Sequence, residues 1–427
     1  MPGRGCQRPL RPRDPARRPR PVRLRRRHSC GGSRIAPRVR RRYGPRAHRG
    51  SGPMTAHVPQ GTGCFSESYA EARTAFLARA TARGAALSSH RNTRATGPGG
   101  EPLYTDVARI GPPGARRIVL CVSGTHGIEG YAGSAVQSAL LAGGYPYDTP
   151  GVAFVAVHAL NPFGFAHRRR VDEDNVDVNR NFVDHARPPA NARYAGLHPF
   201  LVPGDWEGPA HREADTRLGG FAAEHGLRAL QQAVTQGQWT HPDGLFYGGT
   251  APAWAHRTLR DVVAEHTAGA EAVAYVDLHT GLGAPAAVEP IFRGGRDPGA
   301  LARARAWYGP ALTVSEDGTS SSTPITGNSA GLVADVLGDG PELTAITLEM
   351  GTADGLAVLT ALRADNWLWL HPAARPALAE DFARRMSAAF YPDDPGWRDA
   401  VLRAGTGVLH AALAGLAPEA RPRPVRP

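Results

Sequence analysis

The sequence predicts one α/β domain with three layers, in which helices cover both faces of a mixed, mostly parallel sheet. Two observations lead to this fold class. Near-continuous apolar runs, typical of strands buried on both faces, occur four times along the chain. Segments with helical spacing separate these runs, and such alternation favours a parallel sheet between two helical layers. The four predicted strands are residues 117–123, 152–157, 273–278 and 343–348.

The elements between these strands follow in order. A helix is predicted from Phe65, with Ser66 as its cap and apolar residues at helical spacing. A polar stretch rich in Gly and Pro leads from it to the first strand. Residues 131–142 are predicted to be a helix, and the segment 372–416 is predicted to be helical. An insertion over one end of the sheet is expected at about 184–261, with helices at about 211–236 and 253–268.

The first 53 residues differ from the rest in charge. They hold 18 arginines and one acidic residue, whereas the remainder of the chain holds 32 basic and 37 acidic residues, so the tail alone produces the net charge of +12. The tail has too few apolar residues to fold. It is either a basic interaction arm or, as we favour, sequence upstream of the true start at Met54. The domain is therefore expected to span 54–417, followed by a short tail at 418–427.

Composition excludes several classes of protein. No apolar run approaches the roughly 20 residues that a membrane span needs, so no membrane partner is expected. The tail lacks the apolar segment of a signal peptide, and the four cysteines form no CxxC pair. We therefore expect a cytoplasmic protein. Because the foldable part is acidic, no nucleic-acid partner is expected, although the tail leaves that alternative open. The sequence makes no prediction about oligomeric state.

Polar residues with metal-binding chemistry follow three of the four predicted strands. His126 and Glu129 follow the first strand, His279 the third and Glu349 the fourth. In open α/β sheets, ligands bind beyond the carboxyl ends of the strands, so these side chains are expected to meet there. Taken singly, His126 could be a strand-end residue and Glu129 an acid at a helix N-terminus. Together they match the two histidines and one carboxylate of a catalytic zinc site, which keeps one position open.

Five motifs in a fixed order carry a resemblance to a known family. They are SGTHGIEG, NPFGF, DVNRNF, DLHTG and LEMGT, and they span roughly Phe65 to Pro372. In this order the chain resembles the zinc carboxypeptidase A-like superfamily, which includes the aspartoacylase and succinylglutamate desuccinylase branch. It is most similar to a bacterial branch catalogued as a domain of unknown function. The resemblance implies one Zn²⁺ per chain, held by His126, Glu129 and His279.

The resemblance also implies further roles. Asp177 matches the acid that accepts a hydrogen bond from the first ligand histidine. Asn179 and Arg180 match the pair that binds the terminal carboxylate of the substrate, as a planar guanidinium can. Glu349 matches the general base that takes a proton from the attacking water.

Two roles stay open among alternatives. The arginine that stabilises the developing oxyanion is expected among Arg168, Arg169 and Arg170. We favour Arg170 in this catalytic role and keep Arg169 as second choice. The superfamily also uses a tyrosine between the third ligand and the base. Tyr308 lies in that interval and Tyr247 precedes it, and neither is assigned.

The function predicted from these observations is that of a zinc-dependent hydrolase that cleaves a peptide or amide bond next to a free carboxylate. Its substrate would be a small peptide. The alternative is a deacylase of N-acyl amino acids, which would need a small closed pocket that the insertion could form. A serine hydrolase using Ser123 or Ser134 is disfavoured because neither lies in a GxSxG elbow. A non-catalytic zinc-binding protein is a further alternative.

Overall fold

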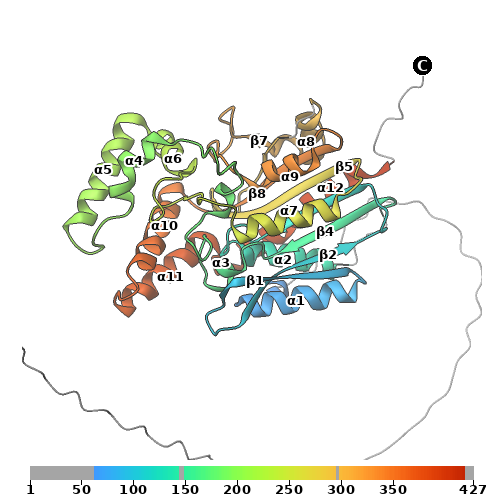
Figure 1. The fold of residues 1–427 in the computed structure, drawn as a ribbon, viewed down its shortest axis with the longest axis horizontal. Helices are drawn as coiled ribbons and strands as arrows, with labels where there is room; N and C mark the ends of the chain where they lie inside the picture. The colour runs from blue at the N-terminus through green and yellow to red at the C-terminus, as the bar shows by residue number, and fades with distance from the viewer. Residues whose placement is uncertain (1–61, 144–148, 295–297, 419–427) are drawn as a thin grey trace, which may run out of the picture. The chain divides into compact units, whose positions relative to one another are not determined.

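The computed structural model describes residues 62–143, 149–294 and 298–418. The predicted tail at 1–53, the proposed start at Met54 and all but the first residue of the tail at 418–427 lie outside these ranges. In the described part, one eight-stranded sheet runs through the molecule with helices on both faces (Figure 1). The strands are β1 (Ala86–Thr96), β2 (Pro102–Ile110), β3 (Arg117–Ser123), β4 (Val152–His158), β5 (Ala272–Leu282), β6 (Val288–Phe292), β7 (Thr313–Val314) and β8 (Glu342–Ala353).

The sheet is mixed and mostly parallel, as predicted. Its strand order is β1-β2-β4-β3-β5-β8-β6-β7. The central strands β4, β3, β5 and β8 run parallel to one another, and β6 pairs with β7 in parallel. The pairings of β1 with β2, β2 with β4 and β6 with β8 are antiparallel. All four predicted strands are therefore present, and they form the centre of the sheet.

Two apolar cores lie on opposite faces of the sheet because side chains alternate along each strand. In β3, Val119 and Cys121 face one core, whereas Ile118, Leu120 and Val122 face the other. Helices α1, α2 and α12 pack on the first face, with α8 beside α12. Helices α7 and α9 pack on the second. Their bounds are α1 (Tyr69–Ala82), α2 (Gly130–Ala142), α7 (Trp254–His266), α8 (Ala300–Tyr308), α9 (Ser329–Leu337) and α12 (Pro395–Leu416).

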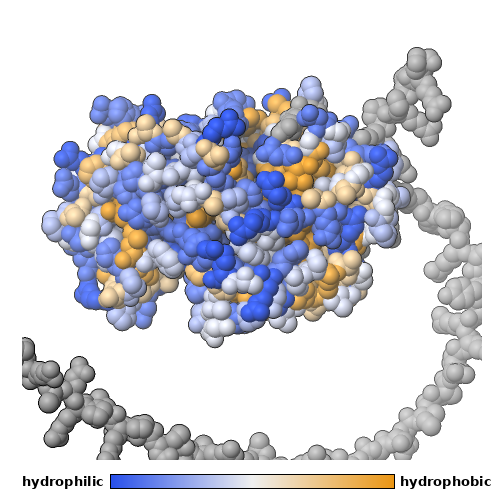
Figure 2. Space-filling model, viewed as in Figure 1, coloured by the Kyte–Doolittle hydropathy of each residue, from blue (hydrophilic) through white to orange (hydrophobic). Residues whose placement is uncertain are grey.

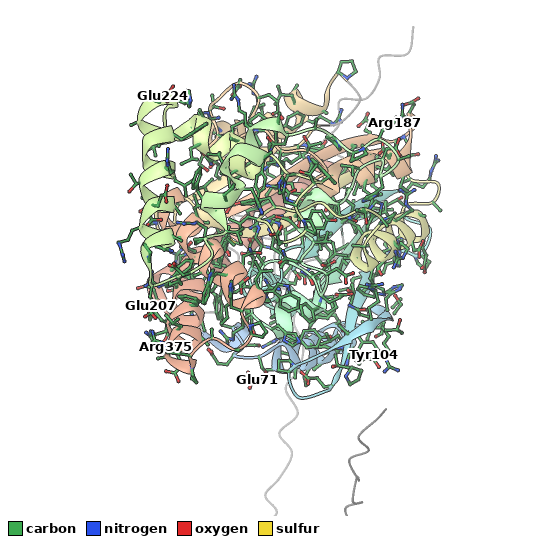
Figure 3. All side chains as sticks on the ribbon, turned by 60° about the vertical axis from the view of Figure 1, so that its left-hand side comes forward. Glu71, Tyr104, Arg187, Glu207, Glu224 and Arg375 are labelled. Carbon is green, nitrogen blue, oxygen red and sulfur yellow. The ribbon has the colours of Figure 1, made fainter. Side chains whose placement is uncertain are left out.

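A separate group of helices gathers at one end of the sheet (Figure 1). Three of them, α4 to α6, come from the predicted insertion, and they share a third apolar cluster with α10 and α11. An ion pair between Glu207 and Arg375, which lie close together in Figure 3, also links the two sets. The bounds are α4 (Ala192–Leu201), α5 (Pro209–His225), α6 (Leu227–Thr235), α10 (Gly355–Leu370) and α11 (Pro376–Phe390). The short helix α3 (Pro162–Ala166) lies outside this group and contacts α1, β1 and β2.

Four expectations need correction. The polar stretch before β3 contains the two strands β1 and β2, which the absence of a continuous apolar run concealed. The helix predicted at 211–236 is two helices, because Gly226 has a φ of 90° and turns the chain between α5 and α6. The cap of α1 is Ser68 rather than Ser66. The helix predicted at 253–268 is present as α7, but it covers a sheet face instead of the sheet end.

The surface is mostly polar. Hydrophilic residues cover much of the face drawn in Figure 2, and the hydrophobic residues there form separate patches. Leu227 and Leu356 are the most exposed large apolar side chains in the described ranges, at 71% and 65%. Within these ranges no helix is both long and apolar enough to cross a bilayer.

Candidate metal centre

The turn after β3 places His126 and Glu129 side by side. The backbone N–H of Gly127 donates to the carbonyl of Arg170 at 3.1 Å, which fixes the turn against a neighbouring loop. A Cβ on Gly127 would lie 1.9 Å from the carbonyl carbon of Gly164, so only glycine fits at this close approach. As a result, His126 Nδ1 and Glu129 Oε1 lie 3.0 Å apart.

His279 joins this pair from β5. Because β3 and β5 run parallel, residues near their carboxyl ends meet at one edge of the sheet. His279 Nδ1 lies 3.1 Å from His126 Nδ1 and 2.9 Å from Glu129 Oε2. The backbone N–H of Thr280 also donates to Glu129 Oε2 at 3.1 Å. The three side chains that the sequence singled out as metal ligands are buried and converge on one point.

An aspartate stands behind each histidine ring. His126 Nε2 lies 3.0 Å from Asp177 Oδ1. On the other ring, Nε2 of His279 lies 3.0 Å from Asp277 Oδ2, at an angle outside the hydrogen-bond range. Asp277 also accepts hydrogen bonds from Thr125 Oγ1 at 2.8 Å and Ser329 Oγ at 2.6 Å. Each ring therefore directs Nδ1 to the shared point while an acid orients its far side.

Charge at this cluster is strongly coupled. Burial alone would raise the pKa of Glu129, but the surrounding His126, His279 and Arg170 hold it well below its usual value. Burial would likewise lower the pKa of His279, yet Asp277 and Glu129 raise it to about 10. The carboxylate is thus charged at neutral pH, and it attracts positive charge to the convergence point.

The donor set fits a divalent transition-metal ion. Two imidazole nitrogens and one carboxylate oxygen form one of the known ligand sets of catalytic zinc sites. Atoms bound at about 2.1 Å to one tetrahedral ion lie about 3.4 Å apart. The separations among His126 Nδ1, His279 Nδ1 and the Glu129 oxygens, at 2.9–3.1 Å, are close to that value, and all three ligand atoms lie within 4.8 Å of one another. The next shell, Asp177 and Asp277, also fits such an ion.

The three consecutive arginines have three different destinations. Arg168 donates to the backbone carbonyl of Glu67 at 2.6 Å, away from the cluster. The guanidinium of Arg169 pairs with Asp365 at 3.1 Å and does not line the cavity around the histidines. Arg170 does line it. Its Nη1 lies 2.8 Å from Glu129 Oε1, and its Nε lies 3.1 Å from Asp177 Oδ2.

Glu349 lies on β8, which pairs with β5, and it is the register partner of His279 on that neighbouring strand. Its Oε1 accepts the backbone N–H of Leu282 at 3.0 Å, which fixes the carboxyl group at the cavity wall. Burial, reinforced by the negative charge of Glu129, raises the pKa of Glu349 to about 7. A carboxyl group with that pKa can both accept and return a proton near neutral pH.

Asn179 and Arg180 lie on a short 3₁₀ turn, Val178–Arg180, and both line the same cavity. Asn179 Oδ1 accepts the backbone N–H of Ser329 at 2.9 Å, which orients its amide. The Nε and Nη2 atoms of Arg180 both donate to the carbonyl of Thr235, at 2.8 and 2.6 Å. Burial lowers the pKa of Arg180 to about 10, so the guanidinium remains charged at neutral pH.

A cavity of about 550 Å³ surrounds these groups, within the usual range for a small-molecule site. Polar groups line part of it, and apolar side chains from α6 and α10 line much of the rest. Neither Tyr308 nor Tyr247 lines it, so both stay without a role. The apolar side chains are Leu227, Leu230, Val234, Phe246, Leu282, Ile325, Leu356, Val358, Leu359, Leu362 and Phe390.

Sequence reasoning did not single out Asp277, Arg293 or the wall formed by α6. Asp277 had a signal, because residues two apart in a strand share a face, and Asp277 and His279 therefore point to the same side. Arg293 had none, since it follows a short strand that was not predicted. The position of α6 depends on how the insertion folds back over the sheet end, and no local pattern encodes that.

The chain matches the sequence model of one family. The match covers residues 65–404, and the family is described as "Protein of unknown function (DUF2817)". This confirms the expected resemblance to a family described as of unknown function. No curated protein matches the chain in sequence.

Several solved structures are similar to the chain at low identity. A carboxypeptidase A from Helicoverpa armigera is 12% identical, with 76% of this chain and 74% of that chain covered and a TM-score of 0.41. A metallo-carboxypeptidase from Burkholderia cenocepacia is 14% identical, with 82% and 69% covered and a TM-score of 0.40. The succinylglutamate desuccinylase from Chromobacterium violaceum is 16% identical, with 73% and 76% covered and a TM-score of 0.33.

Proposed function

This chain belongs to the family described as protein of unknown function (DUF2817), and we propose that it is a zinc-dependent hydrolase of peptide or amide bonds next to a free carboxylate. One observation carries the proposal. Two histidine Nδ1 atoms and the Glu129 carboxylate converge in the same cavity as Glu349, whose pKa is raised to about 7. A metal site beside a carboxyl group with that pKa is the arrangement that hydrolysis by an activated water requires.

His126, Glu129 and His279 would hold the ion. A zinc ion there supplies Lewis acidity toward a water molecule and a substrate carbonyl. Glu349 takes a proton from the attacking water and returns it to the leaving nitrogen as the C–N bond breaks. The same residue therefore acts first as general base and then as general acid. Arg170, fixed by Glu129 and Asp177, places positive charge near the developing oxyanion.

Asn179 and Arg180 are proposed to bind the free carboxylate. The carbonyl of Thr235 engages one edge of the Arg180 guanidinium, which fixes the plane of the group. A fixed guanidinium loses little conformational freedom when it binds a carboxylate through two hydrogen bonds. This contact would set which bond of the substrate reaches Glu349.

A deacylase of N-acyl amino acids is the second candidate. The observation that favours it is the wall that α6 adds to the cavity, because a wall that limits the space suits a compact substrate better than a long peptide. The two activities differ in the size of the group on the acyl side of the bond. Short N-acyl amino acids and peptides of three to five residues, tested side by side, distinguish them.

The first experiment measures metal content and turnover in the full chain. Elemental mass spectrometry should find about one zinc per chain, and His126→Ala and His279→Ala should lose it. His225→Ala is the matched control, because this histidine lies on the exposed face of α5. Glu349→Gln should keep the zinc and lose activity by about 10²- to 10⁴-fold. Zinc-loaded Glu349→Gln protein with normal turnover would refute the mechanism.

A further inference from the structure

Arg293 is a cavity residue to which the proposed chemistry gives no role. It follows β6 directly, and its backbone N–H donates to the carbonyl of Ala345 at 2.9 Å. Its Nε donates to Thr347 Oγ1 at 3.0 Å, and its Nη1 to Ser315 Oγ at 3.2 Å. The side chain is largely buried and lines the same cavity as Glu349. Two hydroxyl groups therefore fix this guanidinium at the cavity wall.

The partners of Arg293 are all neutral. Within the described ranges, no carboxylate oxygen lies within ion-pair distance of its guanidinium. Other buried arginines are paired: Arg170 with Glu129 and Asp177, and Arg363 with Asp215 at 2.7 Å. A buried cation without a direct ion pair is costly, and proteins rarely keep one without a use. Burial lowers the pKa of Arg293, and the more distant charges of Glu349, Glu316, Asp277 and Glu289 offset this only in part.

Arg180 and Arg293 face the cavity together. Arg293 is close enough to Arg180 that its charge contributes to the lowered pKa of Arg180. Two cations that repel each other in a buried cavity are both stabilised when a ligand brings two negative charges between them. Under the proposed function, Arg180 binds the carboxylate next to the scissile bond. Arg293 would then be free to bind a second anionic group of the substrate.

We propose that Arg293 determines specificity by binding a second anionic group on the half of the substrate that bears the free carboxylate. The amino acid released by hydrolysis would then be acidic, with an aspartate- or glutamate-like side chain. This inference rests on the proposed function for the reaction, but the anion site itself does not require turnover. Thr347 and Ser315 hold the guanidinium in place, so it binds without reorganisation.

The test compares matched substrates on the zinc-loaded full chain. The panel pairs N-acyl-glycyl-glutamate with N-acyl-glycyl-glutamine, and N-acetyl-glutamate with N-acetyl-glutamine, so that only the side-chain charge differs. We expect kcat/KM to favour the acidic member by on the order of 10- to 100-fold, mostly through KM. Arg293→Met should bring this ratio close to one, and Arg293→Lys should keep part of it. Arg305→Met, on the exposed face of α8, is the control and should leave the ratio unchanged.

A binding measurement separates this inference from the proposed reaction. Calorimetric titration with glutamate and with glutamine should give tighter binding of glutamate to the wild type, and Arg293→Met should abolish the difference. If glutamine substrates are cleaved as well as glutamate substrates, the hydrolase proposal stands and the anion pocket is overturned. If nothing is cleaved but glutamate binds selectively through Arg293, the pocket stands and the reaction fails. Equal binding of the two amino acids by the wild type overturns the pocket without recourse to any variant.

Discussion

At the scale of single residues, each candidate ligand histidine has its own acid. Asp177 stands behind His126 and Asp277 behind His279, while both Nδ1 atoms point at Glu129. A metal-binding histidine usually donates its other ring N–H to a carboxylate, a backbone carbonyl or water, and this contact fixes the orientation of the ring. Burial of all five side chains keeps this orientation fixed. The candidate ligands are therefore held in position by their neighbours.

The raised pKa of Glu349 predicts the pH dependence of turnover. A general base must be deprotonated, and with a pKa of about 7 this carboxyl group is mostly protonated below that pH. The charge of Glu129 contributes to this pKa and bound zinc would offset it, so in zinc-loaded protein kcat/KM should fall about tenfold per pH unit on the acid side of a midpoint below 7 and level off above it. The pH–rate profile measures this directly. A profile that is flat between pH 5 and pH 8 would exclude Glu349 as the base.

Part of the site could be predicted from residues alone. His126 and Glu129 lie three apart, and His279 follows a buried strand, so the sheet had to bring them to one edge. The role of Arg293 could not be predicted, because it depends on the absence of a direct ion pair. A sequence does not show which charged side chains lack such a pair in the fold. The choice among Arg168, Arg169 and Arg170 also depends on tertiary contacts. Their backbones are adjacent, yet their guanidinium groups lie in three separate environments.

At the scale of elements, β1 and β2 show where sequence patterns fail. β1 is an edge strand with mostly exposed, polar residues, so it lacks the apolar alternation that predicts a strand. In β2 the fully buried Asp106 further disguises the pattern. Its carboxylate accepts two hydrogen bonds from Arg73 on α1, at 2.7 and 3.0 Å, and one from Ser89 Oγ at 2.5 Å. One ion pair thus joins the first helix to the edge of the sheet.

Loss of that ion pair should destabilise the fold. Arg73→Ala leaves the buried Asp106 carboxylate without its cation, and we expect the free energy of unfolding to fall by about 3 kcal/mol. Arg116→Ala is the control, since Arg116 and Glu271 form an exposed pair worth about 0–1 kcal/mol. Chemical denaturation measures both. Equal stabilities for the two variants would show that the Arg73 pair does not secure α1 to the sheet.

At the scale of the whole molecule, the insertion is part of the cavity. Helix α6 contributes Leu230, Val234 and other side chains to the wall. It also supports a loop at residues 318–326, whose Ile325 lines the same cavity. Gln231 Nε2 donates to the carbonyl of Ser321 and Gln232 Nε2 to that of Pro324, each at 3.0 Å. The wall therefore consists of two segments that hold each other in place.

If the hydrogen bonds between α6 and the loop at 318–326 are weakened, we expect substrate binding to weaken while the rate of the chemical step stays the same. Gln232→Ala removes the hydrogen bond to Pro324, a contact worth about 1 kcal/mol, and KM should rise about fivefold. The value of kcat should stay within about twofold, because His126, Glu129 and His279 lie on other elements. Arg217→Ala, in an exposed pair on α5, is the control. A fall in kcat at constant KM would contradict this division.

The insertion has one more consequence, which concerns how members of this family diversify. None of the candidate metal ligands lies between Asp184 and Asp261, and Glu349 does not either, whereas α6 builds much of the wall that a substrate would touch. Changes in this segment can reshape the pocket while the strands that carry the candidate metal ligands keep their sequence. Relatives with the same five motifs but a different insertion should accept different molecules. Exchanging this segment between two relatives should transfer substrate preference along with it.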